Sequence, residues 1–118
     1  MPKPEVTDRT VGFFKKNLET MPHKKRIEYQ NQKLRGIVQY AYKNSIAFKN
    51  KMDSAGLKAK DIQTIKDLEK IPITKKTELM ELQKKNPPFG GFEGVPITEM
   101  RRIFISPGPI YEPGEADS

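Results

Sequence analysis

The stretch that most limits how this chain can fold is its last apolar run, Arg101 to Ile105, which lies close to the end of the sequence. Its β-branched residues predict a buried strand, and the Ser/Gly/Pro-rich residues from Ser106 to Pro113 predict a turn or a ligand-contacting loop. A buried strand needs neighbouring strands, and the five residues after Pro113 are too few to supply one. We therefore expect the chain to be the front part of a larger protein, cut where its core sheet begins.

The composition agrees with a small domain that is incomplete on its own. Of the 118 residues, 35% are hydrophobic and 31% are charged, which is too polar for a self-sufficient α/β enzyme and too patterned for full disorder. No apolar run approaches the roughly 20 residues of a membrane span, and the absence of cysteine excludes disulfides and cysteine-based zinc sites. Because the N-terminus also lacks a signal-peptide pattern, we expect a cytoplasmic protein without a membrane partner.

The positive charge is concentrated in the first half of the chain. Residues 1–60 contain 14 Lys/Arg and 5 Asp/Glu, whereas residues 61–118 contain 8 and 10, which gives a net charge of +7. A basic half can attract nucleic acid, a phosphate-bearing cofactor or an acidic protein surface, and it can also be the solvated face of helices. No nucleic-acid-binding module matches the pattern, so the composition favours solvated helix faces over nucleic-acid binding.

The spacing of apolar residues predicts that residues 1–85 form a helical segment. A short helix is expected over residues 10–18. Pro22 suits the start of a long second helix, whose apolar stripe includes Ile37 and Val38.

Local signals predict where the later helices begin and end. The pair Asn44–Ser45 interrupts the long helix, and Gly56 suits the left-handed position that ends the helix after it. Thr64 with Asp67 resembles a capping pair, and Thr74 is expected to cap a further helix.

A Gly/Pro-rich connector over residues 86–100 separates the helical segment from residues 101–118, which hold the strand and the truncated loop. The predicted fold class is a mainly α N-terminal segment joined to the first β-strand of a larger α/β fold.

The sequence offers few groups for catalysis. His23 is the single histidine and stands beside a proline in a basic run, so we expect it to be exposed and not catalytic. We identify no catalytic constellation, no metal-ligand cluster, no P-loop and no dinucleotide-binding glycine pattern. The turn from Ser106 to Pro113 could hold phosphate oxygens through a hydroxyl and backbone N–H groups. However, Pro107, Pro109 and Pro113 have no N–H, so a purely structural turn is an equal alternative.

Four segments stand in order along the chain: LRGIVQYAYKNSIAF at residues 34–48, MDSAG at 52–56, IPITK at 71–75 and PPFG at 87–90. Together they resemble the N-terminal region of the phenylacetate–CoA ligase family, with family-like spacing over residues 19–113. Members of that family are AMP-forming ligases. The resemblance therefore implies an adenylate-forming fold, ATP, Mg²⁺ and coenzyme A as cofactors, and a small carboxylic acid that is adenylated and then passed to coenzyme A.

The resemblance also assigns a role to the loop after the strand. Ser106 and Gly108 match the family's phosphate loop and are the cofactor-binding residues that the resemblance implies. Five positions depart from the family's pattern: Pro107, Pro109, Ile110 and Tyr111 replace Ser, Thr, Thr and Gly, and Glu112 stands where Lys is common. These changes remove hydroxyl groups and add a carboxylate that repels phosphate.

By itself the chain is expected to be inactive, because the family's adenine pocket, acyl pocket and lid lysine have no counterpart in it. Its expected role is structural, and its expected partner is the remainder of the ligase. The alternative is a free-standing small basic helical protein that binds a protein partner or nucleic acid. Binding of a hydrophobic dye would favour the first interpretation, and cooperative melting would favour the second.

Overall fold

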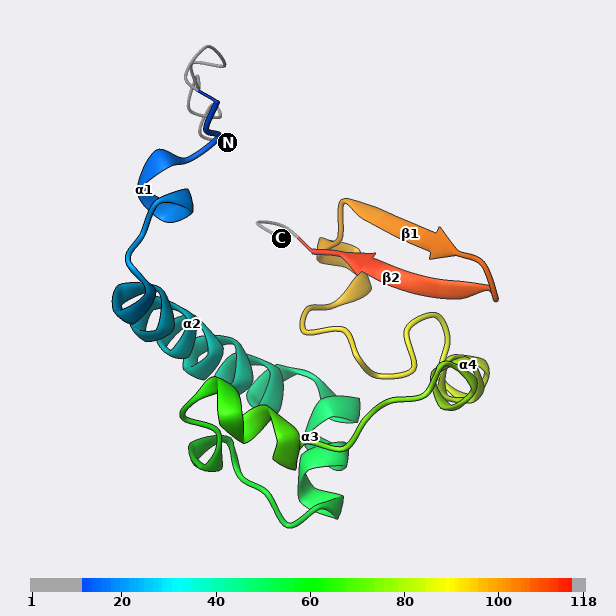
Figure 1. Ribbon diagram of the computed structural model, residues 1–118. Helices are drawn as coiled ribbons and strands as arrows, with labels where there is room; N and C mark the ends of the chain where they lie inside the picture. The colour runs from blue at the N-terminus through cyan, green and yellow to red at the C-terminus, as the bar shows by residue number, and fades with distance from the viewer. Residues whose placement is uncertain (1–11, 116–118) are drawn as a thin grey trace.

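The computed structural model describes residues 12–115, which form a mainly helical layer and one two-stranded sheet. Figure 1 shows the long helix α2 with α3 and the turns that follow it, and the sheet with α4 beside them. In chain order the elements are α1 (Lys16–Glu19), α2 (His23–Asn44), α3 (Ile46–Ser54), η2 (Ala59–Asp61), η3 (Ile65–Lys70), α4 (Lys76–Lys85), η4 (Ile97–Glu99), β1 (Arg102–Ser106) and β2 (Ile110–Gly114).

The breaks around α2 and α3 follow from local backbone chemistry. Pro22, with φ of −58°, immediately precedes α2. Ser45 ends α2 by donating its N–H to the Ala41 carbonyl oxygen at 2.8 Å, and its hydroxyl accepts the Phe48 N–H at 3.3 Å to start α3. Gly56, at φ of 70°, follows α3 in the left-handed conformation. The predicted breaks at Pro22, Ser45 and Gly56 are confirmed.

The main core is small and lies where α2, α3 and the turn after η2 meet. Val38, Met52 and Ile62 are buried together, and half-buried hydrophobic side chains surround them: Leu34, Tyr42, Phe48, Leu57, Ala59 and Ile71. Ile37 was expected on the same stripe as Val38, but it is exposed. The reason is that the side chains of α3 and of the turn after η2 cover only the face of α2 that carries Val38.

The connector over residues 86–100 is packed into the molecule. Phe89 is fully buried, and Gly90 and Gly91 have positive φ angles of 68° and 85°. The Gly91 carbonyl oxygen accepts the Ser45 hydroxyl at 3.1 Å and the Ala47 N–H at 2.8 Å. A Cβ on Gly90 would stand 3.0 Å from the Leu82 backbone, so this close approach requires glycine. The connector therefore ties the start of α3 to the end of α4.

Two helix starts differ from the sequence predictions. The first helix is only Lys16–Glu19, and residues 10 and 11 of the predicted helix lie outside the described residues. Thr74 does not cap α4, which begins at Lys76 after an extended Lys75 without a side-chain cap. Residues 72–75 have no regular secondary structure and Lys75 is extended, so the helix begins later than the threonine indicated.

The predicted strand forms, but its surroundings differ from the prediction. β1 is exposed along most of its length, and it pairs with the antiparallel β2, which lies in the segment expected to be a loop. The partner strand therefore comes from within residues 106–114. Across residues 12–115, none of the helices combines the length and the apolar character that crossing a membrane would require.

Candidate functional site

The candidate site is the tip of the β1–β2 hairpin, where the sequence places the phosphate-type loop. Ser106 ends β1 opposite Ile110, so residues 107–109 close the turn. The Ser106 hydroxyl donates to the Ile110 carbonyl oxygen at 3.5 Å. Gly108 has a positive φ of 154°, and a Cβ there would lie 3.2 Å from Ile110 and 3.3 Å from Lys76. The tip is therefore tightly folded and lies beside the first residue of α4.

The tip presents few hydrogen-bond donors to a phosphate group. Pro107 and Pro109 have no N–H, so Gly108 carries the single backbone N–H of residues 107–109. The Ser106 hydroxyl is turned toward β2, and the exposed Glu112 adds a negative charge to that strand. These residues do not fit a loop that surrounds phosphate oxygens with successive N–H groups. Contact of Ser106 and Gly108 with ATP stays a prediction.

One side chain of α4 fixes β2 in place. Gln83 is 6% exposed, and its Nε2 donates to the Tyr111 carbonyl oxygen at 2.8 Å while its Oε1 accepts the Tyr111 N–H at 3.0 Å. The amide thus pairs with Tyr111 as a neighbouring strand would. Sequence reasoning did not identify Gln83. The sequence contained one usable signal: Gln83 stands four positions after Leu79, and residues four apart lie on the same face of a helix, here the apolar one.

A mainly apolar hollow of about 280 Å³ lies between β2 and the α4 side of the molecule. Leu79, Phe89 and Phe92 line one side of it, and Tyr111 and Pro113 line the other. Its volume is just below the roughly 300–1,000 Å³ of typical small-molecule pockets. Packing between β2 and α4 accounts for this hollow without a ligand.

A larger hollow of about 500 Å³ lies between α3, α4 and residues 72–73. The Lys51 side chain is 10% exposed there, and its Nζ lies 3.3 Å from the Ile73 carbonyl oxygen and 3.4 Å from a Glu78 carboxylate oxygen. Ile46 and Ile73 also line the hollow and remain exposed. The hollow therefore combines a paired charge with uncovered apolar side chains, a combination that sequence reasoning did not identify.

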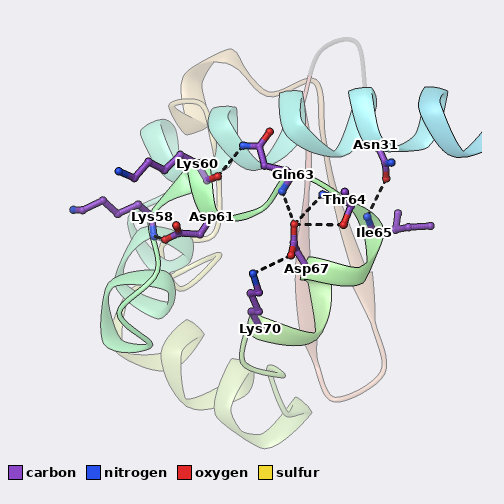
Figure 2. A network of polar contacts seen from close by, with 9 residues as sticks. All are labelled: Asn31, Lys58, Lys60, Asp61, Gln63, Thr64, Ile65, Asp67 and Lys70. Atoms are coloured by element: carbon purple, nitrogen blue, oxygen red, sulfur yellow. Dashed lines mark hydrogen bonds and ion pairs between the residues drawn. The ribbon is translucent and has the colours of Figure 1, made fainter.

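A polar network, shown in Figure 2, fixes the turn around η3. Asp67 Oδ2 accepts the N–H groups of Gln63 at 2.8 Å and Thr64 at 3.0 Å, and Lys70 lies 2.9 Å from Oδ1. The hydrogen bond from Gln63, with those from Lys70 and Thr64, holds the pKa of Asp67 well below its usual range. From α2, Asn31 Oδ1 accepts the first N–H of η3 at 3.0 Å. The predicted Thr64–Asp67 cap is confirmed, and its role is structural.

A second carboxylate links α2 to α3. The Tyr42 hydroxyl donates to Asp53 Oδ1 at 2.6 Å. This hydrogen bond raises the pKa of Tyr42 and lowers that of Asp53. Lys49 also lies 3.5 Å from Asp53 as an exposed ion pair. The pair is remote from the hairpin tip in the chain and serves packing between the two helices.

Sequence comparison connects the chain with phenylacetate–coenzyme A ligases, although no family model matches it. The chain is 34% identical over 101 residues to the enzyme of Thermus thermophilus, covering 86% of this chain and 22% of that protein. It is 34% identical over 84 residues to the Escherichia coli enzyme, covering 71% of this chain and 18% of that protein. The chain thus spans about a fifth of the length of the curated relatives it matches.

Comparison with solved structures leads to the same class of enzyme. A 2-hydroxyisobutyryl-CoA ligase in complex with 2-HIB-AMP, in its postadenylation state, superposes with a TM-score of 0.81 at 28% identity over 90% of this chain. The same ligase with 2-HIB-AMP and CoA, in its thioesterification state, gives a TM-score of 0.82 at 27% identity over 95%. These matches cover 23% and 25% of the solved chains. The described fold matches the N-terminal part of an adenylate-forming CoA ligase.

Proposed function

We propose that this chain, a homologue of the phenylacetate–CoA ligases over most of its length, acts as the N-terminal segment of an ATP-dependent acid–CoA ligase. The observation that carries the proposal is that the sequence matches and the fold matches both lead to CoA ligases. The complete enzyme would activate a small carboxylic acid with ATP as an acyl-adenylate and then transfer the acyl group to coenzyme A. Residues outside this chain would supply most contacts to ATP, Mg²⁺ and coenzyme A.

Within the enzyme, the helices and the connector of this chain would hold its β1–β2 hairpin in place. The Gly91 carbonyl joins the connector to Ser45 at the start of α3, and Gln83 joins α4 to Tyr111 in β2. At the tip, Gly108 then lies beside Lys76, whose ammonium group supplies a positive charge, and Ser106 ends β1 at the same tip. We propose these three residues as the part of the chain that approaches the nucleotide.

The first experiment is the intact mass of the native gene product, captured from the source cells with an antibody against a peptide from α2. The expected result is a polypeptide several times heavier than 13.5 kDa, or this chain together with a larger companion. The captured material should form AMP and an acyl-CoA when ATP, coenzyme A and a carboxylic acid are supplied. Phenylacetate and 2-hydroxyisobutyrate are the first acids to test, because the relatives and solved neighbours are named for them.

A 13.5 kDa species without a companion and without acid-dependent AMP formation would contradict the proposal. The free-standing basic protein would then be the better description. Nucleic-acid binding, if it occurs, would be recognised by an affinity that falls steeply as salt is raised.

A further inference from the structure

The hollow of about 500 Å³ between α3, α4 and residues 72–73 lies apart from the hairpin, because none of its lining residues belongs to β1 or β2. From α4 it is lined by Glu78, Leu82 and Lys85, which share one face of that helix. Gln83, on a different face, bonds to β2. The hollow and the hairpin therefore use different faces of α4.

The hollow contains a buried cation that its own partners hold loosely. The side chain of Lys51 is 10% exposed, and its Nζ lies 3.3 Å from the Ile73 carbonyl oxygen and 3.4 Å from a Glu78 carboxylate oxygen. Both distances exceed the roughly 2.7–2.9 Å of a strong charge-assisted hydrogen bond. An ammonium group has three N–H donors, and within the described part of the chain Lys51 contacts these two groups alone. Lys51 can therefore donate to a further acceptor that enters the hollow.

The charges of the lining favour a ligand with a single negative charge. Lys51 and Lys85 contribute two positive charges and Glu78 contributes one negative charge, which leaves a net charge of +1. A group with two negative charges would exceed this balance and would be repelled by Glu78. The side-chain amides of Asn50 and Asn86 also line the hollow, and an amide can donate to a carboxylate oxygen.

The remaining lining suits the apolar body of such an anion. Ile46 and Ile73 are 69% and 86% exposed, and Leu82 lines the same hollow. An apolar group that lies on these side chains removes apolar surface from water, which favours binding. The volume of the hollow lies within the roughly 300–1,000 Å³ of typical small-molecule pockets.

The same charges distinguish the hollow from a surface that another protein body covers. The centre of a protein–protein interface is depleted in lysine and glutamate, whereas this hollow is lined by Lys51, Lys85 and Glu78. The exposed side chains of Ile103 and Phe104 on β1 have the apolar character that such an interface requires. The lining of the hollow is that of a small-molecule site, with apolar walls and a few polar groups.

We propose that this hollow binds a small monocarboxylic acid, with its carboxylate on the Lys51 ammonium and its apolar body against Ile46, Ile73 and Leu82. Glu78, whose side chain is 46% exposed, competes with the ligand for Lys51 and so limits the affinity. The site is separate from the hairpin tip, and the proposal does not depend on the ligase role.

The test is a titration of the full chain with hexanoate, followed by the amide NMR signals of Lys51, Ile73 and Gly91, which line the hollow. These signals should shift and reach saturation in the millimolar range. Hexan-1-ol has the apolar body without the charge, and inorganic phosphate has charge without the apolar body. Neither should saturate the same signals over the same range.

Three variants identify the group that holds the carboxylate. Lys51→Met keeps the apolar stem and removes the charge, so it should weaken hexanoate binding by about tenfold or more. Lys49→Met is the matched control on the same helix, because Lys49 pairs with Asp53 outside the hollow, and it should bind as wild type does. Glu78→Gln should strengthen binding several-fold, because it removes the competing carboxylate. Helical circular dichroism checks that each variant is folded.

Two results on the chain would overturn the proposal: amide signals that do not saturate with hexanoate, or Lys51→Met binding as tightly as wild type. The titration is repeated on the complete gene product, with and without Lys51→Met. Loss of the Lys51-dependent binding there would also overturn the proposal, because the rest of the protein would then fill the hollow. None of these results bears on the ligase role, which is tested by the native mass and the acid-dependent formation of AMP.

Discussion

At the scale of single residues, Gln83 is the side chain on which the position of the hairpin most depends. It bonds to both backbone groups of Tyr111 from a buried position on α4. Losing these two hydrogen bonds would cost free energy of folding, because the N–H and C=O of Tyr111 would be left partly buried without partners. The position of β2 against α4 therefore depends on a polar side chain at an otherwise apolar helix position.

We expect Gln83→Leu to destabilise the hairpin by roughly 1–3 kcal/mol, the usual cost of leaving buried polar groups without partners. The hairpin should separate from α4 while α2 and α3 remain folded around their own core. The measurement is hydrogen exchange of the Tyr111 amide, together with helical circular dichroism. Exchange should become faster while the helical signal changes little.

Gln39→Leu provides a matched control, because Gln39 is exposed on α2 and its replacement should leave exchange at Tyr111 unchanged. Gln83→Glu adds a second check. At neutral pH it places a carboxylate oxygen against the Tyr111 carbonyl, and protonation at low pH restores a donor. Unchanged exchange in Gln83→Leu would mean that packing of β2 against α4, and not the amide, fixes the strand.

At the scale of elements, the breaks that bound α2 and α3 and the strand β1 could be predicted, whereas β2 could not. Pro22, Ser45 and Gly56 carry local signals, since each acts on backbone groups within four residues of itself. β2 carries no such signal: its Pro113 and Gly114 disfavour a strand, and it forms because β1 and Gln83 pair with it from elsewhere in the chain. A role of Ser106 and Gly108 in binding phosphate stays a prediction, and the closed form of the hairpin tip depends on these distant contacts.

The turn element η3 should show an acid-sensitive stability that originates at Asp67. Its folded pKa lies below the ordinary value of 3.8. The stabilisation is therefore fully present above that value and is lost as the pH falls through the lower folded pKa. We expect Asp67→Ala to lower the melting temperature by a few degrees at neutral pH, because two backbone N–H groups lose their acceptor.

The check is a pair of melting curves, at neutral pH and near pH 3, for wild type, Asp67→Ala and the exposed neighbour control Glu69→Gln. The difference between wild type and Asp67→Ala should shrink at the lower pH, while Glu69→Gln should behave as wild type does. A difference that stays constant with pH would show that the Asp67 charge does not contribute to the cap.

At the scale of the whole molecule, the chain is less compact than a closed domain of the same length would be. Its radius of gyration is 17.1 Å, compared with about 13–14 Å for a compact domain of this size. Exposed large hydrophobic side chains occur on several elements, among them Ile37 on α2, Ile46 on α3 and Phe104 on β1. The buried hydrophobic residues of the described part are few, namely Val38, Met52, Ile62 and Phe89, so much of the apolar surface stays uncovered. The shape is that of a layer that another body can cover.

This uncovered surface leads to the last prediction, that the native chain binds a hydrophobic dye. The fluorescence of anilinonaphthalene sulfonate should rise on mixing with the folded chain, because the 500 Å³ hollow is lined by exposed Ile46 and Ile73. The double variant Ile46→Gln/Ile73→Gln should reduce this signal, whereas Thr77→Gln, an exposed position on α4, should not. If the chain binds no dye and melts in a single cooperative transition, its apolar surface is covered in solution, and the molecule is a closed domain and not a layer awaiting a larger body.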